Sequence, residues 1–166
     1  VVSWGSCTYG GCAPTYSNIV HVFATKTVFI GQKSNGEYVT WGNRLFGGNS
    51  TAVSSKLQSL QYLSFTGGAV AAVMQNGKVV AWGDSRFGGN NGAVANSLNE
   101  VVGLVGNDRA FAALTASGRV VVWGDKEYGG QINDGYLAES LARDVTNVYA
   151  AQGAFAALRT DGRVVT

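Results

Sequence analysis

Few residues in this sequence have the types and spacing that catalysis or metal binding requires. His21 is the only histidine, and it lies in the apolar stretch IVHVF, which is typical of a strand. A metal site or a catalytic triad needs further histidines or a paired nucleophile, and neither follows at a suitable spacing. We therefore interpret His21 as a packed or edge residue. The sequence predicts no catalytic residue, no metal site and no cofactor, so the chain is not expected to be an enzyme.

The two cysteines, Cys7 and Cys12, lie five positions apart in a glycine-rich stretch. This C-x₄-C spacing has no second pair and does not match a zinc pattern. It is compatible with a small disulfide loop and equally with two free thiols.

A glycine-rich stretch, FGGNNG, lies around Gly88, Gly89 and Gly92. It lacks the Lys-Ser/Thr pair of a phosphate-binding P-loop, and its double glycine recurs at the same position in all four repeats. Asp84 and Asp125 each follow a Trp-Gly pair, where short polar side chains bond back to the backbone in Asx-type turns. We predict turns at these positions, with no calcium site and no catalytic carboxylate.

The elements that position these residues repeat four times. Trp-Gly pairs begin at Trp4, Trp41, Trp82 and Trp123, at intervals of 37, 41 and 41 residues, and the four blocks read WGSCTYGG, WGNRLFGG, WGDSRFGG and WGDKEYGG. Such self-similarity is the signature of a repeat architecture. We predict a single repeat domain over 1–166, with repeats at approximately 4–40, 41–81, 82–122 and 123–166.

Each repeat carries the pattern of a β-hairpin. The turns NG, NG, SG and DG precede the strand-like runs EYVT, KVVA, RVVV and RVVT, and an apolar run such as AVAAV or AFAAL lies just upstream. In the third repeat we expect Ala110–Leu114 to pair with Arg119–Trp123. The intervening segments, such as AVANSLNEVVGLVG, predict a short helical turn and then a third strand. The fold class is therefore all-β, with four three-stranded repeats of about 41 residues stacked on one another.

These repeats resemble those of the regulator-of-chromosome-condensation (RCC1-like) β-propeller family. The shared pattern is AFAAL, DG, RVV and WGDxxxGG. The short-bladed β-lactamase inhibitor propellers of bacteria and the tandem-repeat proteins of protists are similar as well. The resemblance implies a β-propeller fold, but it covers a nucleotide-exchange factor, an enzyme inhibitor and ubiquitin-ligase components, so it implies no single function.

Rings of this family usually carry seven blades, and the sequence contains four repeats. Val1-Val2-Ser3-Trp4 and Val164-Val165-Thr166 are copies of the same strand, and both cannot occupy one position in a ring. We therefore expect part of a larger propeller or repeat array. The alternative is a closed four-bladed propeller.

Composition favours a binding or scaffolding module. Hydrophobic residues make up 46% of the chain and charged residues 13%, with a net charge of +2 and no basic stripe. We therefore expect no nucleic-acid partner, and no apolar run is long enough for a membrane span.

The predicted function is a non-catalytic protein-interaction or scaffolding module, as an accessory or structural subunit of a larger assembly. The alternative is a propeller that binds a small ligand or glycan. Tyr16, Tyr136 and Arg143 lie in the segments that vary most between repeats, so we expect protein partners to bind there.

Overall fold

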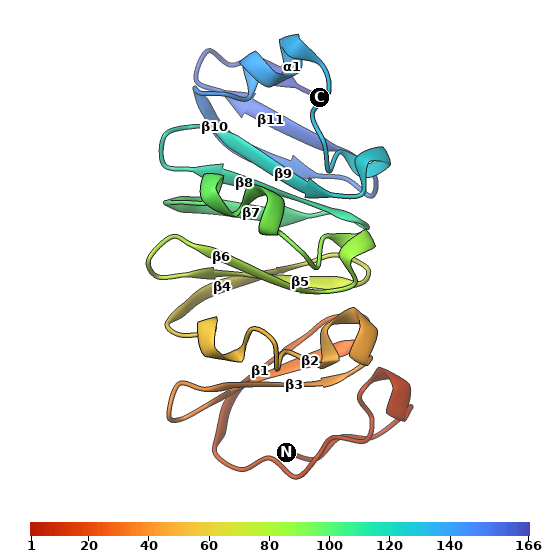
Figure 1. Cartoon of the computed structure of the whole chain (residues 1–166). Helices are drawn as coiled ribbons and strands as arrows, with labels where there is room; N and C mark the ends of the chain where they lie inside the picture. Colours follow the sequence, from red (N-terminus) through yellow and green to blue (C-terminus); the bar gives the residue numbers. More distant parts are fainter.

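The computed structural model describes residues 1–166 and contains four three-stranded antiparallel sheets stacked in a column (Figure 1). In each sheet the strands lie in sequence order, with the second strand in the middle. The strands are β1 (Ile19–Ala24), β2 (Val28–Lys33) and β3 (Tyr38–Gly42); β4 (Leu60–Phe65), β5 (Ala69–Met74) and β6 (Val79–Gly83); β7 (Val101–Gly106), β8 (Ala110–Thr115) and β9 (Val120–Gly124); and β10 (Val145–Ala150), β11 (Phe155–Arg159) and β12 (Val164–Val165).

The predicted hairpins and helical turns are confirmed. Ala110 pairs with Gly124 and Leu114 with Val120, across a turn in which Gly118 adopts a φ of 77° that few other residues tolerate. Short helical turns precede the first strand of the second, third and fourth sheets, as the sequence predicts. They are η3 (Ser54–Lys56), η5 (Gly92–Ser97) and α1 (Gly135–Ser140).

A second set of turns follows each Trp-Gly pair, namely η1 (Cys7–Tyr9), η2 (Arg44–Gly48), η4 (Ser85–Phe87) and η6 (Lys126–Tyr128). The Asx interpretation of this position is confirmed, because Asp84 Oδ1 accepts the backbone N–H of Arg86 at 2.9 Å and Asp125 Oδ1 accepts that of Glu127 at 3.0 Å. Hydrogen bonds from the Arg86 side chain also lower the pKa of Asp84. The first three sheets each end on the Trp-Gly pair with which we began the next sequence repeat, so the sheets are offset from the repeats.

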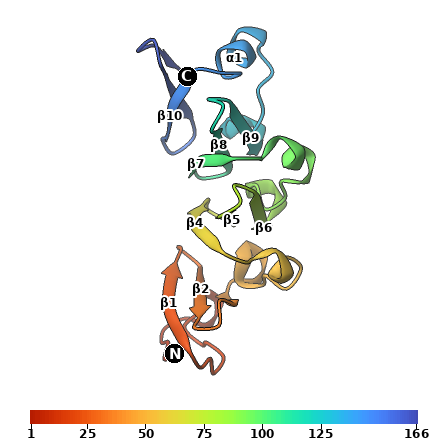
Figure 2. The same cartoon turned by 90° about the vertical axis from the view of Figure 1, so that its left-hand side faces the viewer.

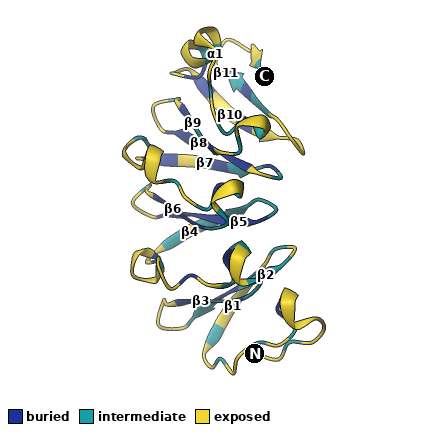
Figure 3. Cartoon of the chain, turned by 45° about the vertical axis from the view of Figure 1, so that its right-hand side comes forward, coloured by how far each residue is buried: buried dark blue, intermediate teal, exposed yellow.

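The hydrophobic core lies between the sheets, as three separate clusters. Every residue of β5 and β8 is buried, and the alanines at their centres let neighbouring sheets approach closely. The leucine directly after each of these helical turns, Leu57, Leu98 or Leu141, is buried in one of the clusters. Figure 3 shows the buried residues along the middle of the column, while α1 and the N-terminal segment are exposed.

Backbone hydrogen bonds join consecutive sheets at both ends of the strands. The Val101 N–H donates to the Gly77 carbonyl and the Val145 N–H to the Gly118 carbonyl, so β7 and β10 each begin on the hairpin turn of the preceding sheet. Glu100 and Asp144, just before these strands, take positive φ values of 52° and 65°. These bonds fix the spacing of the stack.

The column is open. The two ends of the chain lie at opposite ends of the stack in both views, with β1, β4, β7 and β10 along one edge (Figures 1 and 2). The closed four-bladed ring considered as an alternative is therefore wrong for this chain, because its first and fourth sheets do not meet. None of the helical segments has the length and apolar content needed to cross a bilayer.

Candidate protein-interaction surface

Two of the three residues expected to bind a partner lie together at the C-terminal end of the column. Tyr136 belongs to α1 and Arg143 to the turn that follows it, and both line a groove of about 430 Å³. The two side chains are largely exposed. The other lining residues come from α1, its following turn and the β11–β12 hairpin: Glu139, Ser140, Asp144, Arg159, Arg163, Val164 and Val165.

Arg159 builds the floor of this groove. Its side chain is only 17% exposed, and its guanidinium donates to the carbonyls of Ser140 and Arg143, the latter at 3.2 Å. It also lies 3.5 Å from a carboxylate oxygen of Asp144. Because a guanidinium presents several donors in one plane, it holds the turn after α1 against the hairpin.

The charges at the rim are not all neutralised by close pairs. Arg143 and Arg163 approach Asp144 and Asp161 only at 3.7 and 3.9 Å, and both arginine side chains are more than three-quarters exposed. The Arg163 backbone N–H donates to Asp161 and lowers the pKa of that carboxyl, and the neighbouring arginine charges lower it further. The groove therefore presents one aromatic and two cationic side chains to solvent, beside the exposed carboxylates of Glu139 and Asp144.

Replacing Arg159 with Met should loosen the turn after α1 while keeping the packing of the side-chain stem. We expect faster hydrogen exchange over residues 140–144 and a loss of about 1–2 kcal/mol in the free energy of unfolding, because two carbonyls lose a charged donor. The matched control is Arg119→Met, in the β8–β9 hairpin turn of the third sheet, where the side chain is exposed and makes no hydrogen bond or ion pair. Equal exchange in the two variants would contradict the role given to Arg159.

Tyr16, the third expected residue, lies at the opposite end of the column. Its ring packs against Trp41 with centroids 5.6 Å apart, and its hydroxyl is 3.5 Å from the Thr40 carbonyl. The structure therefore does not bring Tyr16 to the groove that Tyr136 and Arg143 share.

The sequence reasoning missed Arg159 and Arg163. A signal was available, because the hairpins are nearly identical and Arg159 occupies the position of Thr115 and Met74 in the preceding sheets. A charged residue in place of a buried threonine or methionine marks a site where one repeat differs from its neighbours.

Other grooves of the column carry different residues. One of about 560 Å³ lies between the hairpin of the first sheet and the helical turn before β4, and it is lined mainly by Ser, Asn and Gln side chains of residues 35–38 and 54–59. One of about 500 Å³ includes Lys56, Lys78 and three asparagines. Only the groove at the C-terminal end combines an aromatic with arginines.

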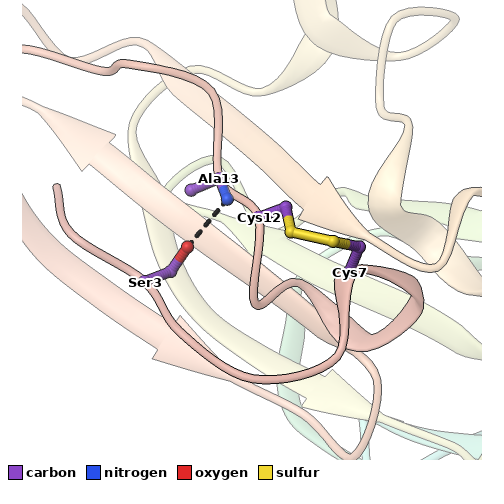
Figure 4. The surroundings of a disulfide bond; sticks show 4 residues. All are labelled: Ser3, Cys7, Cys12 and Ala13. Atoms are coloured by element: carbon purple, nitrogen blue, oxygen red, sulfur yellow. Dashed lines mark hydrogen bonds between the residues drawn. A yellow bond between two sulfur atoms is a disulfide. The ribbon is translucent and has the colours of Figure 1, made fainter.

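Cys7 and Cys12 form a disulfide with their Cα atoms 4.6 Å apart (Figure 4). The bond closes the turn after Trp4-Gly5, and the Ala13 N–H donates to Ser3 Oγ at 2.7 Å beside it. Elsewhere, no group of three or more His, Cys, Asp and Glu side chains is placed to hold a metal ion.

No family model matches the sequence, and no curated protein matches it either. Solved structures are similar in fold. Human WBSCR16 is 16% identical with a TM-score of 0.51, over 88% of this chain and 46% of that one. Prp20p of Saccharomyces cerevisiae is 18% identical with a TM-score of 0.51, over 88% and 42%. The ectodomain of the receptor kinase CR4 of Physcomitrella patens is 14% identical with a TM-score of 0.52, over 92% and 41%.

These similarities show the fold. The four stacked three-stranded sheets share the fold of the repeats in these structures, which include yeast RCC1 (Prp20), as the sequence pattern predicts. The chain spans less than half the length of each of these structures.

Proposed function

We propose that this array of RCC1-like repeats is a non-catalytic protein-interaction module whose partner binds the groove formed by Tyr136, Arg143 and Arg163. The proposal rests on which side chains line this groove and on how they are held. Exposed tyrosine and arginine side chains surround it, and the nearly buried Arg159 holds its walls in place. Tyrosine and arginine are the residue types that most often dominate binding energy at protein interfaces.

The partner's chemistry follows from the charges at the rim. Arg143 and Arg163 are exposed and only loosely paired, so a partner that carries carboxylates beside an apolar side chain would complement the groove. The exposed Val164, at the edge of the same groove, offers the apolar contact.

The variation between grooves supports a protein partner over a repeated small ligand. A glycan-binding propeller with one site per blade would carry the same polar groups in each groove. The three grooves instead present Ser and Asn, Lys and Asn, or Tyr and Arg. The surface therefore differs from one repeat to the next. Such variation favours a single partner that binds at one end of the stack over a small ligand that binds to every repeat.

Two further observations support a place in a larger assembly. Apolar side chains are exposed along the first strands of the sheets, at Val20 and Val22 of β1, Val102 of β7 and Tyr149 of β10. Among proteins of this fold, Prp20p has been studied for its binding to Gsp1p and histones, and yeast RCC1 has been crystallised with Kap60. By analogy of fold, we propose that this chain is an accessory or structural subunit.

The test is capture of partners from an extract of the natural source on the immobilised chain. The double variant Tyr136→Ala/Arg143→Ala should reduce the captured amount of any partner of this groove at least about tenfold, as loss of interface hot spots does. Because both side chains are exposed, the circular dichroism spectrum and the melting temperature should not change.

The matched control is Arg44→Ala/Leu45→Ala, which removes an exposed arginine and an exposed apolar side chain from the η2 turn of another sheet. It should leave capture intact. If the two double variants capture the same proteins in the same amounts, the groove at the C-terminal end is not the binding surface.

A further inference from the structure

The loop between β3 and β4 contains the tripeptide Asn49-Ser50-Thr51, directly after the double glycine of the second repeat. The pattern Asn-x-Ser/Thr, in which x is not proline, is the acceptor pattern for N-linked glycosylation, and it occurs nowhere else in the chain. The loop joins the first two sheets, whereas the groove beside α1 lies at the C-terminal end of the column (Figure 1). The tripeptide is therefore separate from the proposed partner site.

The amide oxygen of Asn49 is engaged in hydrogen bonds and the amide nitrogen is free. Asn49 Oδ1 accepts the backbone N–H of Thr51 at 3.1 Å and the Thr51 hydroxyl at 2.7 Å. Because a backbone N–H can only donate, the atom it contacts must be the oxygen of the amide. Asn49 Nδ2 makes no hydrogen bond within the chain. This nitrogen is the atom to which an N-linked sugar is attached.

The middle residue of the tripeptide anchors the loop to β3. Ser50 is 6% exposed, its backbone N–H donates to Thr40 Oγ1 at 3.0 Å, and the Thr40 hydroxyl donates to Ser50 Oγ at 3.1 Å. Asn49 and Thr51, on either side of Ser50, are both exposed. A sugar attached to Asn49 therefore extends into solvent and displaces no side chain of the core.

The third repeat shows that the turn forms without the threonine hydroxyl. Asn90 holds the position of Asn49 and is exposed as well, and its Oδ1 accepts the backbone N–H of Gly92 at 2.9 Å. The two asparagines thus share a repeat position, an exposed surface and a turn. They differ in the residue two positions further on, which carries a hydroxyl only after Asn49. Asn90 is therefore an internal control for Asn49.

The disulfide between Cys7 and Cys12 is an observation independent of the tripeptide. Disulfides form and persist in the endoplasmic reticulum and in secreted and surface proteins, whereas the cytosol keeps thiols reduced. Asparagines of the acceptor pattern are glycosylated in secreted proteins, on surface loops. The disulfide and the exposed tripeptide therefore indicate the same cellular route.

We propose that Asn49 is an N-glycosylation site, and that the oligosaccharide comes from a lipid-linked diphosphate donor. In this transfer Asn49 Nδ2 loses one proton and forms a bond to the anomeric carbon of the first sugar. The bond between that carbon and a phosphate oxygen of the donor breaks, and the lipid diphosphate leaves with the electron pair. The proton passes to a base of the transferase, and no group is oxidised or reduced.

Peptide mapping of the protein from its natural source tests this assignment. Trypsin cleaves after Arg44 and Lys56, so Asn49 lies in peptide 45–56, and it cleaves after Arg86 and Arg109, so Asn90 lies in peptide 87–109. We expect peptide 45–56 to carry a glycan that peptide N-glycosidase removes, leaving aspartate in place of the asparagine. Peptide 87–109 should carry no glycan. A peptide 45–56 without sugar overturns the proposal.

Variants secreted from animal cells test the role of the hydroxyl. Thr51→Ser keeps a hydroxyl and should keep the sugar on peptide 45–56, whereas Thr51→Ala should lower the glycosylated fraction at least about tenfold. Both variants should fold, because Thr51 is exposed. If Thr51→Ala carries as much sugar as the native sequence, the tripeptide does not direct the modification.

Gly92→Thr is the matched variant of the third repeat, and it should make Asn90 an acceptor. Gly92 is exposed, and an added Cβ there lies near only the flexible side-chain oxygen of Asn90, at 3.1 Å. We expect this variant to carry sugar on peptide 87–109 as well as on peptide 45–56. If only peptide 87–109 is modified, the chain reaches the transferase but Asn49 is not an acceptor, and the proposal is wrong.

Discussion

Replacing Trp123 with Ala should lower the free energy of unfolding by about 4 kcal/mol, whereas Trp4→Ala should change it by less than about 0.5 kcal/mol. The two residues lie in the same Trp-Gly motif but differ in burial, 4% against 86% exposed. Loss of Trp123 leaves a cavity beside Phe111 and removes the hydrogen bond to the Gly88 carbonyl. Loss of Trp4 leaves no cavity.

Urea unfolding followed by circular dichroism measures both effects without relying on tryptophan fluorescence. Trp123→Phe separates the two contributions, because it keeps a stacked ring but leaves the buried Gly88 carbonyl without a donor, which costs about 1–2 kcal/mol. The same change at Trp41 should cost less, because the buried indole N–H of Trp41 has no hydrogen-bond partner. If Trp123→Ala and Trp4→Ala lower the free energy of unfolding equally, the position of a tryptophan in the stack does not determine how much it stabilises the protein.

The repeat pattern predicted the sheets because their local signals are strong and agree with one another. In the third repeat, the turn at Gly118 and the apolar runs on both sides fix a two-stranded hairpin with one register. The intervals between the tryptophans then give the period at which the sheets recur along the sequence. The Asx turns at Asp84 and Asp125 were predictable in the same way, because each carboxylate accepts a hydrogen bond from the backbone N–H only two residues further on.

Features that depend on a neighbouring sheet could not be predicted in this way. Trp4 and Trp123 have the same local sequence, and only the presence of a sheet beneath the ring makes one of them a core residue. The hydrogen bond from the Val101 N–H to the Gly77 carbonyl of the preceding sheet is another such feature. Such contacts join residues about 25 positions apart.

The candidate site was only partly predictable for the same reason. Tyr136 and Arg143 were found because they lie in a segment where the repeats differ, and that segment forms one wall of the groove. The opposite wall comes from Arg159 and Arg163 in the hairpin, where the repeats look alike. Variation within a conserved hairpin is a weaker signal than variation in a loop, although Arg159 makes more contacts than either predicted residue.

Within the fourth repeat, Gly130→Ala and Gly135→Ala should change stability in opposite directions. Gly130 is the second glycine of the repeated pair, and a Cβ atom there would lie 2.5 Å from the carbonyl carbon of Gly124 and 2.6 Å from its oxygen. Backbone atoms cannot move aside as a side chain can, so the turn after the Trp-Gly pair must open. We expect a loss of about 3 kcal/mol in the free energy of unfolding.

Gly135 is the matched control, since it lies five residues further along, at the start of α1, with no atom within 4 Å of an added Cβ. Alanine there should raise the free energy of unfolding by about 0.5–1 kcal/mol, because it restricts the unfolded chain and favours the helix. Urea unfolding of both variants measures the difference. A neutral Gly130→Ala would mean that the double glycine is not required by the contact with Gly124. A large loss there, with a gain at Gly135, would explain why the pair occurs in all four repeats.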